Sequence, residues 1–322
     1  MSKPALRLAF VMDPIESISV AEDTTFVIML EAQNRGHRVF YVDPAHLGVR
    51  SGQVEAVVTE VTLRREVGNH VDLGESRRVV LDEEIDVAFQ RVDPPVDENY
   101  RLATQMLALC RRTRVLNRPE SILAYNEKLF ALQFRELMTE TAVTRSIPEL
   151  RDLLSRMGGE MIVKPLDGKG GEGIFHVREG DPNVVSILEQ ATGFGHRWTM
   201  AQRYLPEVRE GDKRILLLEG EPLGAVLRVP AEGETRANLH VGGRAQATEL
   251  DDQDRRIVAA VGPVLAEQGL FFVGLDVIGG CLTEINVTSP TGVQEVDALE
   301  DCCLEGRILD RVEALVGEGR SG

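Results

Sequence analysis

Three oxygen-bearing side chains lie in two apolar segments near the end of the chain. Glu284 and Asn286 are two residues apart, so a β-strand through them would point both side chains to the same face. Asp276 lies in the preceding apolar segment, on the other side of Gly279-Gly280. Two carboxylates and an amide oxygen on one face form a hard oxygen site, which suits Mg²⁺ and also accepts Mn²⁺. The pattern therefore predicts a divalent-metal site, with solvated acidic residues on an exposed sheet face as the structural alternative.

The geometry of this site depends on the turn that joins the two strands. A strict two-residue turn at Gly279-Gly280 would pair Asp276 with Thr283, and Asp276 would face away from Glu284. A three-residue turn or a β-bulge would instead set Asp276 opposite Glu284. We predict the second register, in which a cation would offset the repulsion between two adjacent carboxylates.

A glycine-rich segment at residues 168–173 and two lysines are the second group of candidates. The segment matches G-x-G-x-x-G, but a strand pattern follows it where the dinucleotide fingerprint needs a helix, and no Walker A ending closes it. A loop between two antiparallel strands can still cover phosphates, because glycines let backbone N–H groups approach the oxygens closely. Lys164, at the end of the preceding strand, would place an ammonium on a phosphate. A ligand-free hairpin explains the loop equally well, and Lys128 taken alone is predicted to be an exposed helix lysine.

Alternating strand and helix patterns in the first third of the chain would position further polar residues. Strands are predicted at residues 6–12, 37–42, 85–90 and 114–116, and helices at 24–35 and 98–112. Such alternation implies an α/β domain with a parallel or mixed sheet covered by helices. Ligands in that architecture sit beyond the carboxyl ends of strands, which is where Asp13 and Arg91 lie.

The rest of the chain carries two further patterns. Residues 128–200 are typical of a small α+β unit, and residues 199–287 carry mostly antiparallel strand signals interrupted by a helix at 252–267. The polar, glycine-rich stretch at 230–246 has no periodicity, and its length favours a functional lid over a passive connection. We therefore predict three parts: an N-terminal α/β domain at 1–123, a central α+β subdomain at 124–200 and a C-terminal α+β subdomain at 201–322.

Composition restricts the class of partner. The 322 residues carry a formal net charge of -16, which argues against nucleic acid or an anionic membrane because such binding needs clustered Lys and Arg. No apolar run approaches the about 18 residues of a membrane span, and no signal-peptide core follows Met1, so a cytoplasmic protein is expected. The four cysteines have no metal-ligand or disulfide spacing and are predicted to be reduced. The lone Trp198 is predicted to lie in the core.

Eight segments, spread over nearly the whole chain, carry a combined signal. They are Val11-Met12-Asp13-Pro14-Ile15, Asp93-Pro94-Pro95, Asn126-Glu127-Lys128-Leu129-Phe130, Lys164-Pro165-Leu166-Asp167-Gly168, Gly211-Asp212-Lys213-Arg214, Gly233-Glu234-Thr235-Arg236-Ala237-Asn238, Gly242-Gly243-Arg244 and residues 284–291. These resembling segments are similar, in the same order, to those of bacterial glutathione synthetases, which have the ATP-grasp fold. The ATP-grasp segments alone fit any ligase of this superfamily. The Met-Asp-Pro, Asp-Pro-Pro and Gly-Glu-Thr-Arg segments narrow the resemblance to glutathione synthetases.

The resemblance implies that ATP lies between the two α+β subdomains. The residues implied to bind ATP are Lys128, Lys164, Gly168, Gly170, Gly171, Gln202, Tyr204, Leu205 and Asp212. The residues implied to hold two Mg²⁺ ions are Asp276, Glu284 and Asn286. The residues implied to stabilise the reacting groups are Arg214, Arg228 and Arg236. The residues implied to bind the small-molecule substrates are Asp13, Ser17, Arg91, Asn238, Ser289 and Thr291.

The activity implied is ATP-dependent ligation of γ-glutamylcysteine to glycine. The dipeptide carboxylate attacks the γ-phosphate of ATP, and the glycine amine then displaces phosphate from the acyl phosphate. The stretch at 230–246 would close as a lid, because an acyl phosphate exposed to water hydrolyses. The resemblance also implies a homotetramer. The alternatives are another ATP-grasp carboxylate–amine ligase, such as one that joins D-amino acids, and a non-catalytic ATP-binding protein of the same fold.

Overall fold

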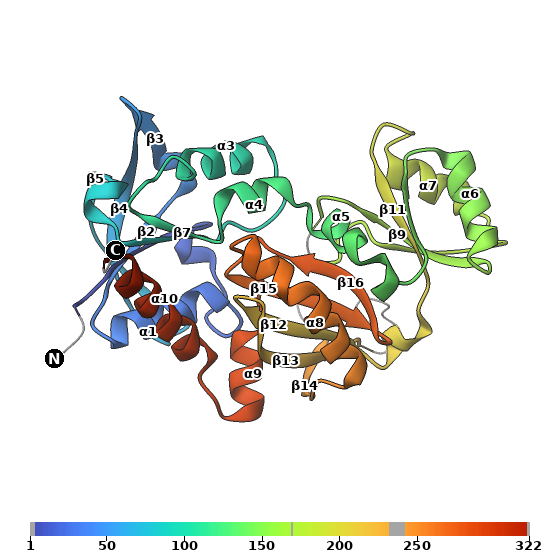
Figure 1. Cartoon of the computed structure of the whole chain (residues 1–322). Helices are drawn as coiled ribbons and strands as arrows, with labels where there is room; N and C mark the ends of the chain where they lie inside the picture. Colours follow the sequence, from blue (N-terminus) through green and yellow to red (C-terminus); the bar gives the residue numbers. More distant parts are fainter. Residues whose placement is uncertain (1–3, 169, 232–241, 321–322) are drawn as a thin grey trace.

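The computed structural model describes residues 4–168, 170–231 and 242–320. Figure 1 shows an N-terminal unit and a C-terminal sheet packed side by side, with a small four-stranded unit at the far end of the molecule. Within the described residues no helix is long and apolar enough to cross a membrane. The four cysteines are free, as predicted.

The N-terminal unit is built around a seven-stranded mixed sheet. Its strands are β1 (Arg7–Val11), β2 (Arg38–Val42), β3 (Leu47–Arg50), β4 (Gln53–Leu63), β5 (Val71–Val80), β6 (Val87–Gln90) and β7 (Arg114–Leu116). Its helices are α1 (Thr24–Asn34), α2 (Leu81–Glu84), α3 (Glu98–Leu107) and α4 (Pro119–Ala124). The strand order is β3-β4-β2-β1-β6-β7, with β5 paired to β4.

The parallel part of this sheet agrees with the sequence analysis. β1 pairs in parallel with β2 and β6, and β6 pairs in parallel with β7. The antiparallel strands β3, β4 and β5 were not predicted. β5 is exposed from residue 72 to residue 78, so it lacks the apolar alternation that marks a half-buried strand.

The small unit is a four-stranded antiparallel sheet with two helices. Its strands are β8 (Thr141–Thr144), β9 (Glu160–Pro165), β10 (Phe175–Arg178) and β11 (Thr199–Arg203), in the order β10-β9-β11-β8. Its helices are α6 (Ile147–Arg156) and α7 (Val184–Thr192), and α5 (Glu127–Ala131) precedes them. The strands and α6 confirm the predicted α+β pattern, while α7 was not predicted.

The C-terminal sheet is antiparallel and carries the predicted metal-ligand strand. Its strands are β12 (Asp212–Leu218), β13 (Glu221–Val229), β14 (Arg244–Ala247), β15 (Phe272–Ile278) and β16 (Cys281–Asn286), in the order β14-β13-β12-β15-β16. The helices are α8 (Asp252–Glu267), α9 (Val293–Glu300) and α10 (Leu304–Arg320). α8 has the predicted bounds, because Asp251 and Asp254 form a capping box at its start. Residues 244–246 of the predicted lid belong to β14, which pairs with β13, whereas 232–241 lie outside the described residues.

Two of the hydrophobic cores show how the three parts of the molecule are joined. One core contains Phe10 and Phe26 of the N-terminal unit together with Leu216, Phe272 and Ile308 of the C-terminal part. The small unit has a core of its own, built from residues of α6, α7, β9, β10 and β11. α5 lies between the small unit and the C-terminal sheet and packs against β16 (Figure 1). The N-terminal and C-terminal parts are therefore joined by apolar packing, while the small unit is attached chiefly around α5.

Candidate active site

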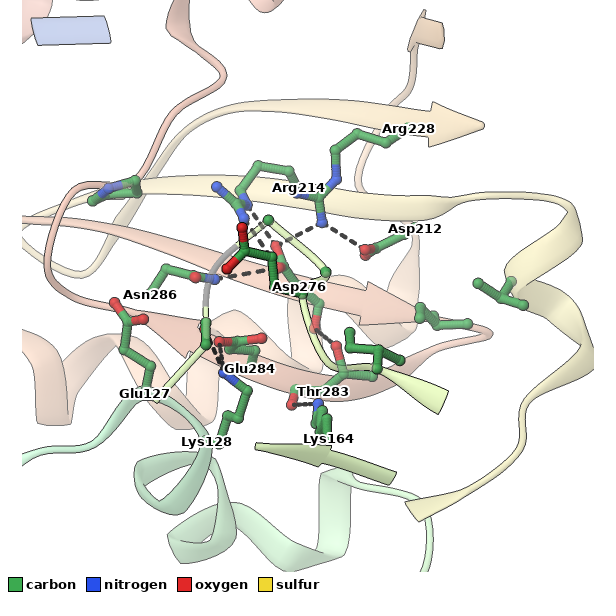
Figure 2. A pocket seen from close by; sticks show the side chains of 18 of the residues that line it. Glu127, Lys128, Lys164, Asp212, Arg214, Arg228, Asp276, Thr283, Glu284 and Asn286 are labelled. Carbon is green, nitrogen blue, oxygen red and sulfur yellow. Dashed lines mark hydrogen bonds and ion pairs between the residues drawn. The ribbon is translucent and has the colours of Figure 1, made fainter. Parts of the chain in front are cut away.

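A cavity of about 700 Å³ lies where the three parts of the molecule meet. It is lined by α5, the loop between β9 and β10, β11, the C-terminal sheet and the segment that follows β16. Predicted site residues that line it are Lys128, Lys164, Gly168, Gly170, Gly171, Gln202, Tyr204, Leu205, Asp212, Arg214, Arg228, Asp276, Glu284, Asn286, Ser289 and Thr291. Figure 2 shows the charged members of this set converging from opposite walls. The structure therefore brings most of the predicted residues to one place.

The predicted strand register is confirmed. Asp276 pairs with Glu284, and the register shifts between Asp276 and Val277, so that Val277 pairs with Leu282. Thr283 is the extra residue of this β-bulge, and its hydroxyl donates to the Asp276 carbonyl at 3.1 Å. The bulge rather than a longer turn restores the facing of the two carboxylates.

Asn286 is held beside Asp276 on this face. Its Nδ2 donates to the Gly274 carbonyl at 3.2 Å and to Asp276 Oδ2 at 3.3 Å. Asp276, Glu284 and Asn286 thus lie together on adjacent strands at the wall of the cavity. Among the described residues no group of three or more His, Cys, Asp or Glu side chains has an arrangement that could hold a metal ion. The predicted set offers only two carboxylates, because its third member is an amide.

Two buried arginines neutralise the carboxylates of the C-terminal sheet. Arg214 binds Asp276 through two hydrogen bonds, at 2.5 Å from Nε to Oδ1 and 3.0 Å from Nη2 to Oδ2. Arg228 Nη2 lies 2.6 Å from Asp212 Oδ2 and 3.0 Å from Asp276 Oδ1. Burial alone would raise the pKa of Asp276, but the two guanidinium groups outweigh it and hold the pKa well below its usual value. We call Asp212, Arg214, Arg228 and Asp276 the sheet network.

Asp212 is the least compensated member of the sheet network. Burial raises its pKa to about 7, because Arg228 offsets only part of the desolvation and Asp276 adds a like charge. Asp212 Oδ1 and Arg228 Nε are buried and have no hydrogen-bond partner within the described part of the chain. Both atoms are therefore left to bond a group other than the described side chains.

The two lysines reach the metal-ligand strand from outside its sheet. Lys128 Nζ donates to Glu284 Oε1 at 3.0 Å and to the Gly168 carbonyl at 3.1 Å, and Lys164 Nζ donates to the Thr283 carbonyl at 3.3 Å. Burial acts to lower the pKa of Lys128, but Glu284 raises it above the ordinary value, whereas burial lowers the pKa of Lys164. The prediction of an exposed Lys128 is wrong, because this side chain is only 4% exposed.

The glycine-rich segment joins two antiparallel strands, as predicted. β9 and β10 pair with Phe175 opposite Val163. Gly170 and Gly171 have φ values of 59° and 82°, which a residue with a side chain rarely adopts. Residue 169 lies outside the described residues. The loop is therefore a hairpin connection at the cavity wall and not a dinucleotide fingerprint.

The predicted adenine strand ends at the cavity. Gln202 Nε2 donates to Thr141 Oγ1 at 3.1 Å, so the Gln202 side chain is already engaged. Tyr204 stacks on His176 with ring centroids 3.9 Å apart, and its buried hydroxyl has no hydrogen-bond partner among the described residues. The backbone of Gln202 also pairs with Thr141 of β8 and Ile162 of β9, so this strand is anchored in the small sheet where it reaches the cavity.

Three residues predicted to bind substrate do not line the cavity. Asp13 Oδ2 accepts a hydrogen bond from Asp93 N at 2.8 Å, and the Ser17 hydroxyl donates to the Pro14 carbonyl at 2.7 Å. Arg91 is buried and donates to Thr25 Oγ1 at 2.9 Å and to the Pro290 carbonyl at 3.0 Å. The residues that the N-terminal unit does contribute to the cavity wall are Glu22, Asp93 and Pro94. Arg236 and Asn238 lie outside the described residues.

The sequence analysis missed several residues of the cavity and misplaced one aromatic side chain. Glu127, Thr283, Thr288 and Glu295 line the cavity without having been predicted. Glu127 and Thr288 lie inside two of the resembling segments, but neither residue was assigned a role. Trp198 is 55% exposed, so its predicted core position is wrong.

Two family models match the chain. The model of the N-terminal domain of prokaryotic glutathione synthetase matches residues 6–122, and that of the ATP-grasp domain of the same family matches residues 127–301. The glutathione synthetase of Mesorhizobium japonicum is 46% identical over 309 residues, covering 96% of this chain and 98% of that protein. Those of Brucella melitensis and Shewanella oneidensis are 44% and 42% identical, covering 96% and 97% of this chain and 99% and 100% of theirs.

Solved structures of more distant proteins share the fold. The D-cycloserine synthetase DcsG superposes with a TM-score of 0.64 at 15% identity, covering 96% of this chain and 99% of that chain. A RimK domain ATP-grasp protein from Sphaerobacter thermophilus superposes with a TM-score of 0.62 at 16% identity, covering 94% and 98%. At such identities the likeness establishes the ATP-grasp fold alone. The match of both domains and the near-full-length identity establish more: the chain belongs to the prokaryotic glutathione synthetase family.

Proposed function

We propose that this protein is a glutathione synthetase, which ligates γ-glutamylcysteine to glycine and converts ATP to ADP and phosphate in the same reaction. The observation that carries the proposal is the cavity in which buried lysines and arginines meet the two carboxylates and the amide of β15 and β16, in a chain similar to glutathione synthetases over nearly its whole length. Phosphoryl transfer depends on positioning and charge neutralisation more than on covalent catalysis, and this cavity supplies both.

The nucleotide lies between the small unit and the C-terminal sheet in this proposal. Lys128 and Lys164 contact its phosphates, and the hairpin loop with Gly168, Gly170 and Gly171 covers them. The adenine lies against the end of β11 and the residues that follow it, where Gln202, Tyr204 and Leu205 line the cavity. Asp212 completes the wall near the phosphates.

Asp276, Glu284 and Asn286 fit two Mg²⁺ ions, or Mn²⁺, as a hard oxygen set on adjacent strands. Mg²⁺ typically uses one or two carboxylates together with nucleotide phosphates and water, so an incomplete protein ligand set is expected without nucleotide. Lys128 and the two arginines now compensate these carboxylates, which keeps the site stable before a cation arrives. The bound metal would neutralise charge on the phosphate oxygens.

Arg214, Arg228 and Arg236 stabilise the acyl phosphate and the oxyanion of the tetrahedral intermediate. Arg214 and Arg228 line the cavity and have rigid ion-pair partners, so they need little reorganisation during the reaction. The residues proposed for the dipeptide and glycine are Asp13, Ser17, Arg91, Asn238, Ser289 and Thr291. Ser289 and Thr291 line the cavity, whereas Arg91 acts on the same segment through the Pro290 carbonyl.

We propose further that residues 1–123, 124–200 and 201–322 act as three units. The 124–200 unit moves as a lid, because the small unit has a hydrophobic core of its own. The proposal also includes a homotetramer in the cytoplasm. It includes no nucleic-acid or membrane partner, which agrees with the acidic composition.

Product formation tests this function against other ATP-grasp ligations. Purified protein with ATP and Mg²⁺ is supplied with γ-glutamylcysteine plus glycine, or with D-alanine alone, and ADP and the ligated product are measured. We expect glutathione and ADP in equal amounts from the first pair only. Ligation with D-alanine alone would assign a different ATP-grasp ligase activity, and ATP binding without turnover in either mixture would indicate a non-catalytic protein.

A further inference from the structure

Three consecutive residues at the start of α5 connect parts of the cavity that are far apart in the sequence. Asn126 Nδ2 donates to the Leu166 carbonyl at 2.8 Å, just before the glycine-rich hairpin loop. Lys128 links that loop to Glu284. Glu127, between them, points to the segment that follows β16, and the proposed reaction gives this carboxylate no role. We call Asn126, Glu127 and Lys128 the α5 junction.

Glu127 makes a concentrated set of contacts with the segment after β16. Its Oε1 accepts hydrogen bonds from Val287 N at 2.8 Å, from Thr288 N at 3.0 Å and from Thr288 Oγ1 at 2.8 Å. The side chain is buried, with 8% of the residue exposed. A buried carboxylate is costly unless hydrogen bonds satisfy it, so these three donors are the reason it is tolerated here.

The segment at residues 287–291 is held from other directions as well. Asn117 Nδ2 donates to the Val287 carbonyl at 2.7 Å. Arg91 donates to the Pro290 carbonyl at 3.0 Å, and Arg214 Nη1 donates to the Thr291 carbonyl at 3.1 Å. Asn117 and Arg91 belong to the N-terminal unit and Arg214 to the C-terminal sheet. Glu127 is therefore the contact that ties this segment to α5, and through α5 to the hairpin loop.

We propose that Glu127 is a positioning residue, which fixes α5 to the 287–291 segment through its Oε1 acceptor. This contact sets Lys128 against the phosphate side of the cavity and Ser289 and Thr291 against the substrate side. Glu127 acts through these groups and not as a metal ligand or a general base. The part of this inference that concerns Ser289 and Thr291 rests on the proposed function, because it involves the substrate of that reaction. The part that concerns Lys128 involves nucleotide binding alone.

Glu127→Gln and Glu127→Ala in the full-length chain separate positioning from charge. Glutamine keeps a side-chain oxygen that can accept from the same donors, whereas alanine removes the acceptor. Two quantities are measured: the Kd of ADP in the presence of Mg²⁺, by calorimetry, and kcat and KM for γ-glutamylcysteine. Thr288→Val is the matched partial variant, because it removes one of the three donors and keeps both backbone amides. Thermal unfolding of each variant reports stability separately.

The alanine variant is expected to bind ADP about tenfold more weakly and to lose about 100-fold in kcat/KM for the dipeptide, because small misplacements at a reacting centre have effects of that size. The glutamine variant should stay within about fivefold of the wild type in both quantities, since its side-chain oxygen still accepts the same hydrogen bonds. The values for Thr288→Val should fall between those of the glutamine and alanine variants.

Equal losses in the glutamine and alanine variants would overturn the inference, because the charge and not the acceptor would then matter. A lower unfolding temperature of the alanine variant with wild-type ADP affinity and KM would also overturn it, by assigning Glu127 to stability alone. If the alanine variant does not fold, Glu127→Gln and Thr288→Val carry the same comparison. A wild-type protein that forms no glutathione would refute the proposed function, while the ADP affinities would still decide the role of Glu127.

Discussion

The sheet network and the α5 junction are two buried charge systems in one cavity, and they are built in opposite ways (Figure 2). The sheet network joins side chains on adjacent strands, with Asp212 paired to Arg228 and Arg214 to Asp276 in the strand register itself. The α5 junction reaches segments that are 40 to 160 residues away in the sequence. Local register therefore fixes the first system, whereas tertiary packing fixes the second.

This difference leads to different expectations for the two systems. In the proposed reaction, charged and polar groups of the sheet network and its neighbours Glu284 and Asn286 face the reacting groups, so their removal should remove chemistry or leave a buried charge unpaired. The α5 junction works through the placement of other groups, so its variants should have graded effects. The four predictions that follow test this contrast, from the largest expected effect to the smallest.

Glu284→Gln should abolish measurable ligation while the protein remains folded, with kcat reduced by at least about 1000-fold. The substitution keeps the size of the side chain but removes the charge that pairs with Lys128 and that the proposed metal ion would need. Product formation by chromatography and far-UV circular dichroism check the two halves of this prediction. Glu219→Gln is the control, because Glu219 pairs with Arg311 away from the cavity and should leave turnover at the wild-type level. Near-normal turnover of Glu284→Gln would refute the metal assignment.

Arg228→Met should destabilise the protein by about 3–5 kcal/mol and reduce kcat by about 100-fold, because it leaves Asp212 and a share of Asp276 uncompensated in a buried site. Urea denaturation and steady-state kinetics measure the two effects. Arg311→Met is the matched variant at a half-buried ion pair and should cost less than about 1 kcal/mol. Similar costs at both positions would mean that the sheet network is no more critical than a surface pair.

Asp212→Asn should change how stability depends on pH. Since burial raises the pKa of Asp212 to about 7, the folded protein holds its proton more tightly than the unfolded chain. The stability that comes from this proton is fully present below the ordinary carboxyl pKa range and is lost as the pH rises through about 7. The amide cannot ionise, so the stability of the variant relative to the wild type should rise by roughly 2–3 kcal/mol between pH 5 and pH 8. Denaturant titrations without nucleotide at both pH values measure this gain. A difference in stability between variant and wild type that is the same at both pH values would contradict the raised pKa of Asp212.

Asn126→Ala should have the smallest effect, about 1 kcal/mol in stability and about a threefold increase in KM for ATP. Asn126 caps α5 by accepting from Lys128 N and Leu129 N, and it also holds the Leu166 carbonyl. Asn183→Ala is the control, because Asn183 precedes α7 without a side-chain cap bond. Equal effects at the two positions would show that Asn126 has no role beyond its residue type.

Sequence reasoning predicted the sheet side of the site well, because strand periodicity relates neighbours directly. Residues two apart share a face, and the only uncertainty was the turn, where the bulge at Thr283 gave the predicted pairing of Asp276 with Glu284. The parallel strands of the N-terminal unit and the bounds of α8 followed from equally local signals. β5 was missed because its exposed residues carry no apolar pattern.

The α5 junction was beyond sequence reasoning for a physical reason. A lysine in a short helix is normally exposed, and α5 buries Lys128 where it packs against β16. The contacts of Glu127 with Val287 and Thr288 depend on how three parts of the chain come together, which no periodicity encodes. Arg91 illustrates the same limit, since its position at a strand end gave no sign that its guanidinium holds the Pro290 carbonyl, far away in the sequence.

The central claim is that the cavity activates the dipeptide carboxylate as an acyl phosphate, and an isotope-transfer experiment tests it most directly. γ-Glutamylcysteine with its cysteinyl carboxylate labelled with heavy oxygen is incubated with ATP, Mg²⁺, glycine and the enzyme. The released phosphate is then analysed by mass spectrometry. The account predicts one labelled oxygen in the phosphate for each glutathione formed, because the attacking carboxylate oxygen leaves with the phosphoryl group. Phosphate without the label, with glutathione still formed, would contradict it.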